Sequence, residues 1–458
     1  MIFKILSYKN KLIVLFLFLF SVAINQHYGN RGIFPIDSFL IFDAAYNITS
    51  GNHPFKDYWA ITGPLLDYIQ SFYFFIFGIN WFSYVLHAST INMIITLCSF
   101  YFFSKIGLKT FYAFIYSLGV AILAYPNAGT PFIDHHAVIL CTISIYALII
   151  AILLKKNFYW FIVPIFIVLS FFSKQIPSAY FLILFFLIIG FYFFYTKDFN
   201  KKNLVYFICG FIFSLLMIFS IFIINEIPFK NFLVQYIFYP LSLGNDRTLG
   251  LNIDFKNLVS QFKFIYLASL PAVISLILLM TKKEKSMQQK KEIVILILFI
   301  FSLLVFIYSQ LITKNQVFIF FLIPIAAAIS HSYTLKYFNK KYLVYLILIL
   351  FIFSTGKYHL RFNHNKKFME LINADFALAG PAHQIDEKLK GLKWITPSYS
   401  KEPSKEIKLL TDVKKILLNS PKNKIIISDY LFFSSILQTK ISSPNKWYDN
   451  LSVPNNKN

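Results

Sequence analysis

Long apolar runs separated by short polar segments occupy most of this 458-residue chain. A helix needs roughly 20 apolar residues to cross a bilayer, and fewer where neighbouring helices thin it. The eleven predicted spans are 11–27, 82–103, 110–125, 136–154, 157–173, 177–195, 203–224, 264–280, 293–311, 316–332 and 342–356. A further apolar helix is expected at Leu65–Gly78, at the outer interface. The pattern therefore predicts an all-α polytopic membrane protein.

Composition and charge narrow the functional classes. The chain is 57% hydrophobic and only 14% charged, whereas soluble domains carry about 25% charged residues. The net charge of +23 does not indicate a nucleic-acid binder, because the basic residues lie mainly between the apolar runs and in the tail. Cys98, Cys141 and Cys209 all fall inside apolar runs, at spacings that match no metal or redox motif.

The distribution of basic residues predicts the orientation in the membrane. With a cytoplasmic N-terminus, the inner connections carry eighteen Lys and Arg residues and the outer connections before the tail carry eight. Positive charge concentrates on the cytoplasmic side of membrane proteins. An odd number of spans then places the tail, about 357–458, on the extracytoplasmic side. The Phe-rich, Lys-rich and Arg-poor composition suggests an AT-rich bacterial genome, so we expect a multi-pass protein of the bacterial inner membrane.

The tail differs from the rest of the chain in being polar and rich in Lys and Pro. Its pattern predicts a helix at Asp412–Leu418, a buried strand at Lys424–Ser428 and a helix at Asp429–Leu437. We therefore expect two domains. A transmembrane module, 1–356, would carry outer loops 28–81 and 225–263, and a small soluble α/β domain, 357–458, would follow it.

The polar segment from Phe34 to Tyr68 is the first candidate for a functional site. It holds four carboxylates in a chain of few charges, namely Asp37, Asp43, Asp57 and Asp67. Acidic residues beside a bilayer are costly and mark candidate sites. Asp37 begins a helical pattern, Ser38 to Thr49, and fits an N-cap as well as it fits a general base. Asp43 lies within that helix, and Asp57 and Asp67 are expected to be surface or cap residues.

Other outward segments add side chains of suitable chemistry. Asp134, His135 and His136 lie at the outer mouth of the fourth span, where Asp and His together can bind a divalent cation. Adjacent His residues on a helix point in different directions, so we do not expect both to be ligands, and a polar helix end explains the three residues better when they are taken alone. Lys174, between two apolar runs, and Arg247, in loop 225–263, carry positive charge that suits a lipid phosphate. Lys314, which opens the tenth span, is either a phosphate contact or an interface anchor.

Several of these segments resemble the GT-C glycosyltransferases, in particular the lipid A aminoarabinose transferases and the bacterial protein mannosyltransferase-like enzymes. The matching segments follow in the family's order and are Asp37–Gly51, Gly63–Gln70, Thr130–Tyr146, Phe171–Pro177 and Asn315–Pro324. Asp37 and Asp134 fall on acidic positions of the family, and Lys174 falls on its lysine. Where the family often has Asp-Glu followed by Arg-Tyr, this chain has Ile36-Asp37-Ser38-Phe39.

The resemblance implies a GT-C-like fold and an integral-membrane glycosyltransferase. The enzyme would move a sugar from a polyprenyl-phosphate donor to an acceptor hydroxyl, of a lipid, glycan or protein, at the extracytoplasmic face. By analogy, Asp37 would deprotonate the acceptor or hold a divalent metal ion with Asp134. Asp134, with His135 and Asp43, would position the acceptor or the metal. Lys174, Lys314 and Arg247 would neutralise the donor phosphate.

Two other functional classes remain open from the sequence. A transporter or flippase of a lipid-linked or polar solute would fit the apolar spans, but the chain shows no obvious internal repeat and few paired Gly/Pro-broken helices. A non-catalytic membrane component with an external binding domain would fit if Asp37 were exposed and dispensable. The position of Asp37 relative to Asp134 and Lys174 distinguishes these classes from the enzyme.

Overall fold

The computed structural model describes residues 8–198, 200–244, 254–313, 316–338, 340–439, 441, 444–447 and 452–454. Most of these residues are helical. The helices of the bundle are α1 (Tyr8–Gly29), α5 (Trp81–Lys105), α6 (Thr110–Leu123), α7 (Ile133–Leu154), α8 (Asn157–Ser173), α9 (Gln175–Thr196), α10 (Lys201–Ile224), α14 (Lys263–Thr281), α15 (Met287–Thr313), α16 (Leu322–Tyr337) and α17 (Lys341–Tyr358). The shorter helices are α2 (Pro35–Ser38), α3 (Leu40–Thr49), α4 (Pro64–Phe77), α11 (Phe229–Phe232), α12 (Tyr239–Ser242), α18 (Pro403–Asn419) and α19 (Phe433–Leu437).

The predicted all-α polytopic class is confirmed. Each predicted span falls on a helix of the bundle. Within the described ranges, eight helical segments are long and apolar enough to cross a membrane: Asn10–Gly29, Trp81–Lys105, Ile133–Leu154, Gln175–Thr196, Lys201–Ile224, Lys263–Thr281, Met287–Thr313 and Lys341–Met369. Helices α6 and α8 are apolar but shorter, and α16 has 16 residues. The count of eleven crossings stays a prediction.

Helix α7 forms the centre of the bundle. Its residues are buried without interruption from Ile133 to Ile152, as expected for a helix that is apolar on all faces. It packs against α5, α8, α9 and α15. Because Asp134 and His135 lie in its first turn, the most buried helix of the molecule also carries two of the predicted site residues.

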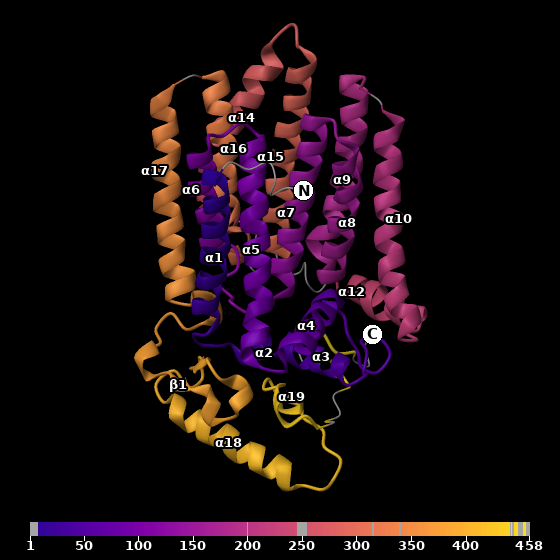
Figure 1. Cartoon of the computed structure of the whole chain (residues 1–458), viewed down its shortest axis with the longest axis vertical. Coiled ribbons are helices and arrows are strands. Elements are labelled where there is room, and N and C mark those ends of the chain that lie inside the picture. Colours follow the sequence, from indigo (N-terminus) through magenta and orange to yellow (C-terminus); the bar gives the residue numbers. More distant parts are fainter. Residues whose placement is uncertain are drawn as a thin grey trace.

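The segments predicted to lie outside gather at one end of the bundle. Figure 1 shows α2, α3, α4 and α12 at this end, with the tail that contains α18 and α19 beneath them. The lysine-rich turn between α14 and α15 lies at the opposite end (Figure 1). We call the end with α2, α3, α4 and the tail the loop end. The grouping agrees with the predicted topology, whereas the side of the membrane that the loop end faces stays a prediction.

The tail and the first loop share one hydrophobic core. Phe39, between α2 and α3, is fully buried, and its ring centroid lies 4.4 Å from that of Phe432 and 5.9 Å from that of Trp394. Trp81, at the start of α5, completes the cluster at 5.8 Å from Phe39. Aromatic side chains bury large areas, so this cluster fixes the tail against the bundle. The proposed domain boundary at residue 356 therefore separates two parts that pack together.

The predicted α/β character of the tail is not confirmed. The helix expected at Asp412–Leu418 lies within the longer α18, and the helix expected from Asp429 is reduced to α19. Over the described part of the tail, the only sheet pairs the two-residue strands β1 (Gly380–Pro381) and β2 (Lys393–Trp394), which run antiparallel. The strand expected at Lys424–Ser428 does not form.

The apolar run at 424–428 differs from the expected strand in its burial. Ile425 is 60% exposed and Ile427 is 71% exposed, whereas a buried strand would cover these side chains. Ile425 takes part in an isolated β-bridge, and no described segment forms a strand beside it. Three consecutive isoleucines indicate β propensity, but propensity alone does not bury the run.

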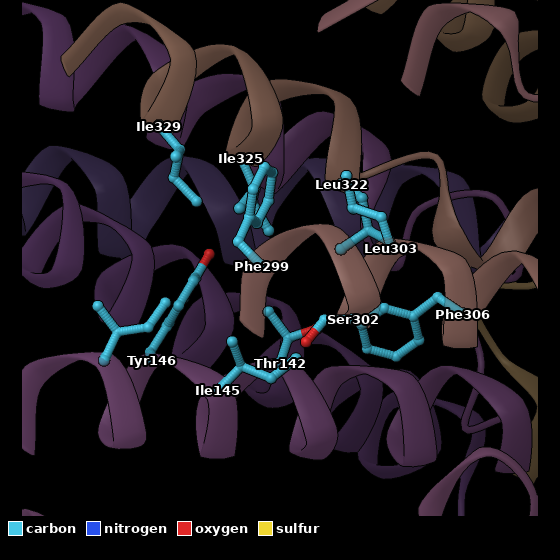
Figure 2. Close-up of a pocket in the computed structure, with 11 residues that line it drawn as sticks. Thr142, Ile145, Tyr146, Phe299, Ser302, Leu303, Phe306, Leu322, Ile325 and Ile329 are labelled. Carbon is cyan, nitrogen blue, oxygen red and sulfur yellow. The ribbon is translucent and has the colours of Figure 1, made fainter. Parts of the chain in front are cut away.

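A small apolar cavity lies between α7, α15 and α16. Figure 2 shows Ile145 of α7, Phe299 of α15 and Ile325 of α16 around it. The hydroxyl of Ser302 also lines the cavity and is buried without a hydrogen-bond partner. A cavity with so few polar groups does not favour water. We therefore regard this cavity as a packing defect between helices and not as a substrate site.

The C-terminal segment returns to the first loop and contributes a buried ion pair. The Trp59 N–H donates to the Pro444 carbonyl, and the Lys446 N–H donates to the Trp59 carbonyl, both at 2.8 Å. Lys446 Nζ then contacts both carboxylate oxygens of Asp67, at 2.7 and 2.6 Å, and the Thr62 carbonyl at 3.0 Å. Burial raises the pKa of Asp67, and the Lys446 ammonium opposes this shift. Asp67 is therefore a fully buried ion-pair partner, and the expectation of a surface or cap residue is wrong.

This ion pair leads to a stability prediction. Asp67→Asn leaves the Lys446 ammonium buried without its counter-ion, which typically costs 3–5 kcal/mol. We expect faster proteolytic cleavage of the C-terminal segment in detergent-solubilised Asp67→Asn than in the wild-type protein. The double variant Asp67→Leu with Lys446→Met removes both charges and should recover most of the resistance. Equal cleavage rates for wild type and Asp67→Asn would contradict a stabilising role of the pair.

Candidate functional site

The loop end brings together three residues that the sequence predicted as a site. Asp134 lies in the first turn of α7, which begins after the extended residue Phe132. Lys174 is the extended residue between α8 and α9, where the backbone N–H donates to the Ser170 carbonyl. Asp37 lies in α2, a single turn started by Pro35, whose fixed φ suits the first helical position. Helix ends thus position each of these side chains.

Asp134 and Lys174 form a buried ion pair. Lys174 Nζ donates to Asp134 Oδ1 at 2.6 Å, and the two side chains are 11% and 5% exposed. An ammonium has three donors, and this is the one hydrogen bond that Lys174 Nζ makes with a described residue. The pair therefore places a positive charge with unused donors at the loop end.

Asp37 has no bonded partner within the described chain. The cap of α2 is Phe34, which makes no side-chain cap hydrogen bond, and the Asp37 N–H donates to the Phe34 carbonyl at 3.1 Å. The Asp37 carboxylate makes no hydrogen bond or ion pair with any residue that the structure describes, although the residue is partly buried. The structure thus does not support the N-cap interpretation. A partly buried carboxylate without a partner is available for a ligand.

The electrostatic surroundings of Asp37 connect it to the ion pair. Burial raises the pKa of Asp37 to about 7, and repulsion from Asp134 acts in the same direction. The Lys174 ammonium lowers this pKa in part, while Asp429 and Glu370 raise it further. Asp37 therefore lies within electrostatic range of both members of the pair. A carboxyl group that titrates near neutral pH is suited to general acid–base chemistry.

Two of these neighbours are residues that the sequence did not predict. Glu370 follows the short helical turn after α17, and Asp429 precedes α19, so both belong to the tail. They lie more than 300 positions from Asp37 along the chain, and no local pattern connects them. The tail therefore contributes directly to the electrostatics of the site.

The other predicted residues lie in different surroundings. Asp43 accepts hydrogen bonds from Ser434 and Ser435 of the tail. It also accepts a hydrogen bond from the Asn47 amide of its own helix, α3. Burial raises its pKa to about 6 against these hydrogen bonds. The structure thus gives Asp43 a role in docking α19 onto α3, rather than a place beside Asp37.

His135 lies in an aromatic cluster. Its ring lies 4.7 Å from that of Tyr125 and 4.4 Å from that of Phe318. Neither ring nitrogen makes a hydrogen bond of good geometry with the described residues. The backbone acceptor that affects the ring electrostatically belongs to Ala124. Arg247 and Lys314, the two other predicted phosphate contacts, lie outside the described residues.

The described side chains do not support the divalent metal ion that the family resemblance implied. Asp37 and Asp134 are the two predicted ligands, but Oδ1 of Asp134 already accepts from Lys174. The described residues contain no group of three or more His, Cys, Asp or Glu side chains that could hold a metal ion. Divalent cations bound by proteins usually need several oxygen or nitrogen ligands. We therefore derive no step through a metal.

A chain of buried polar side chains joins His136 to residues that the sequence did not predict. His136 Nδ1 contacts the Tyr125 hydroxyl at 2.5 Å, and His136 Nε2 contacts His87 Nε2 at 3.0 Å. His87 Nδ1 in turn contacts Gln70 Oε1 at 3.0 Å. This chain joins α7, α5 and α4, and so fixes the start of α7, where Asp134 lies. The available signal was the occurrence of His and Gln inside apolar helical runs.

Comparisons with known proteins give a distant likeness to solved structures. No family model matches the chain, and no curated protein matches it. Among solved structures, the chain is similar to the crystal structure of the Archaeoglobus fulgidus oligosaccharyltransferase in complex with zinc and sulfate, at 13% identity and a TM-score of 0.48. The likeness covers 93% of this chain and 61% of that protein. These values are too low to assign a family or an activity.

The raised pKa of Asp37 predicts a dependence of stability on pH. The usual value of 3.8 rises to about 7 in the folded protein, so folding disfavours the ionised form and wild-type stability falls as pH rises between these values. Asp37→Asn removes this effect. At pH 8 we expect the free energy of unfolding of the variant to exceed that of wild type by up to about 4 kcal/mol, since one pKa unit corresponds to about 1.4 kcal/mol. The variant should accordingly unfold at a higher temperature.

The difference in stability between Asp37→Asn and wild type should become smaller as the pH is lowered from 7 towards 4, because Asp37 of the folded wild-type protein becomes protonated over that interval. Thermal unfolding of both proteins in the same detergent across this pH range measures the difference. An advantage that does not change with pH would show that Asp37 titrates at its ordinary value.

Proposed function

We propose that this protein is an integral-membrane glycosyltransferase with a GT-C-like architecture. It would transfer a sugar from a polyprenyl-phosphate donor to an acceptor hydroxyl at the extracytoplasmic face of a bacterial inner membrane. The observation that carries the proposal is the unpartnered Asp37 carboxylate beside the Asp134–Lys174 pair, at the loop end of an apolar helical bundle. A base and a cation at a membrane surface are the two groups that this reaction needs.

The proposed reaction follows from these two groups. The Asp37 carboxylate accepts the proton of the acceptor hydroxyl as the hydroxyl oxygen forms a bond to the anomeric carbon of the sugar. The bond between this carbon and the phosphate oxygen breaks at the same time, and its electron pair leaves with the polyprenyl phosphate. Attack opposite the leaving group inverts the configuration at the anomeric carbon. The proton stays on Asp37 until it passes to solvent.

Lys174 would stabilise the leaving phosphate. The negative charge on the phosphate increases as the bond breaks, and a positioned cation lowers the free energy of that state. Asp134 holds the Lys174 ammonium in place through the 2.6 Å hydrogen bond, and the remaining ammonium donors can face the phosphate. Asp134 is thus a positioning residue. We assign no step to Arg247 or Lys314, and the roles of both as phosphate contacts stay predictions.

Replacement of Asp37 tests the proposal directly. Removal of a general base typically lowers the rate 10²–10⁴-fold. We expect Asp37→Asn to lose sugar transfer from a radiolabelled polyprenyl-phosphate sugar by at least about 100-fold. Asp57→Asn is the matched control, because this exposed carboxylate of the same loop accepts from the His53 N–H. Transfer by Asp37→Asn at the wild-type rate would exclude Asp37 as the base.

The rate of transfer should also depend on pH. Asp37 acts as a base only when it is ionised, and its pKa is raised to about 7. We therefore expect kcat/KM to increase with pH below 7 and to level off above it. Initial rates measured with wild-type protein between pH 5 and 9 give this profile. A rate that is constant from pH 5 upwards would show that no group titrating near 7 controls the reaction.

A further inference from the structure

Lys366 is a buried lysine whose amino group has no partner among the described residues. It follows α17 and the turn His359–His364, in a left-handed backbone conformation with φ of 46°. The side chain is fully buried, and Nζ makes no hydrogen bond with any residue that the structure describes. No carboxylate of the described residues forms an ion pair with it. Buried lysines are otherwise paired, because the low dielectric of the protein interior penalises an isolated charge.

The surroundings of Lys366 add positive charge rather than compensate it. The Arg31 guanidinium repels a positive charge on Lys366. A positive charge on the His27 ring, at the end of α1, is likewise repelled by Arg31, Lys366 and Lys393. We call Lys366, Arg31, His27 and Lys393 the cationic cluster. Like charges repel, so this cluster is unfavourable unless an anion joins it.

The backbone holds the cluster together from three distant parts of the chain. The Gly32 N–H donates to the Lys393 carbonyl at 3.0 Å, and the Lys393 N–H donates to the Asn30 carbonyl at 2.9 Å. The Tyr28 hydroxyl contacts His359 Nε2 at 3.2 Å, which joins the ends of α1 and α17. Arg31 lies over the Phe376 ring at 4.6 Å. The cluster is therefore a built site in which α1, α17 and the tail meet.

We propose that the cationic cluster binds a phosphate group, with Lys366 as its central contact and Arg31 as the second. The site lies at the loop end of two helices that are long and apolar enough to cross a membrane. Lysine and arginine are the usual protein ligands of phosphate. The site is separate from Lys174, whose ammonium is paired with Asp134. The phosphate comes either from a membrane phospholipid or from a soluble phosphorylated molecule.

The test compares wild type with Lys366→Met in a phosphate-free maltoside detergent. Sodium phosphate is titrated at constant ionic strength, and the thermal unfolding midpoint is recorded. In parallel, phosphatidylglycerol is added to the micelles and bound lipid is counted by native mass spectrometry. We expect wild type to respond saturably to one of these probes, and Lys366→Met to need at least about 10-fold more of it, since a hydrogen bond to a charged group contributes about that factor.

The outcomes distinguish the two sources and leave the proposal open to refutation. A response to phosphate alone indicates a soluble phosphorylated ligand, and a response to phosphatidylglycerol alone indicates a lipid head group. Lys230→Met, which removes an exposed lysine at the same end of the bundle, should respond as wild type does. Identical behaviour of wild type and Lys366→Met with both probes, including no response at all, would overturn the proposal.

Two further measurements protect the test against misfolding of the variant. Without phosphate, Lys366→Met should unfold at the same temperature as wild type or higher, because it removes an unpaired buried charge. If the variant does not fold, Arg31→Gln replaces it, and we expect a several-fold weaker response at this partly exposed position. Arg31→Gln with the wild-type response would then overturn the proposal. Neither variant touches Asp37 or Lys174, so loss of transfer activity is a separate result.

Discussion

The pairing of buried charges is the constraint on which the loop end of this protein depends. Hydrocarbon offers no hydrogen-bond partner, so ionised groups at the end of an apolar bundle must be satisfied by the protein. Asp134 is paired with Lys174, and Asp67 is paired with Lys446. Asp43 accepts from side chains of α19. These contacts fix the starts of α3, α4 and α7 relative to one another and to the tail.

Two ionisable groups do not follow this rule. One is the carboxyl group of Asp37 and the other is the amino group of Lys366, and neither has a bonded partner among the described residues. The two proposals start from these exceptions, because burial of an unpartnered polar group costs free energy that a ligand recovers when it bonds to the group. An acceptor hydroxyl would bond to Asp37, and a phosphate would bond to Lys366.

Much of this arrangement could be predicted from the sequence. Apolar length predicted the helices, and each predicted span falls on one of them. Asp37, Asp134 and Lys174 were predicted to converge, and electrostatic contact between them is present. The tail could not be predicted as well, because its isoleucine run has strand propensity but stays exposed. Glu370, Asp429 and Lys446 come from remote segments, so only tertiary packing brings them to the loop end. His87 was missed because it forms no recognisable motif, and His136 was considered only as a neighbour of Asp134 and His135.

The packing of Phe39 against Trp394 and Phe432 has a consequence for synthesis of the protein. The loop that carries Asp37 is made early, but the side chains that close its core are made after almost all of the bundle. Contacts between such distant segments form slowly, and incomplete chains expose apolar surface in the meantime. A nascent chain that stopped before residue 394 would present Phe39 and Trp81 uncovered. Those rings are therefore a natural signal by which a cell's chaperones and proteases could distinguish unfinished molecules from complete ones.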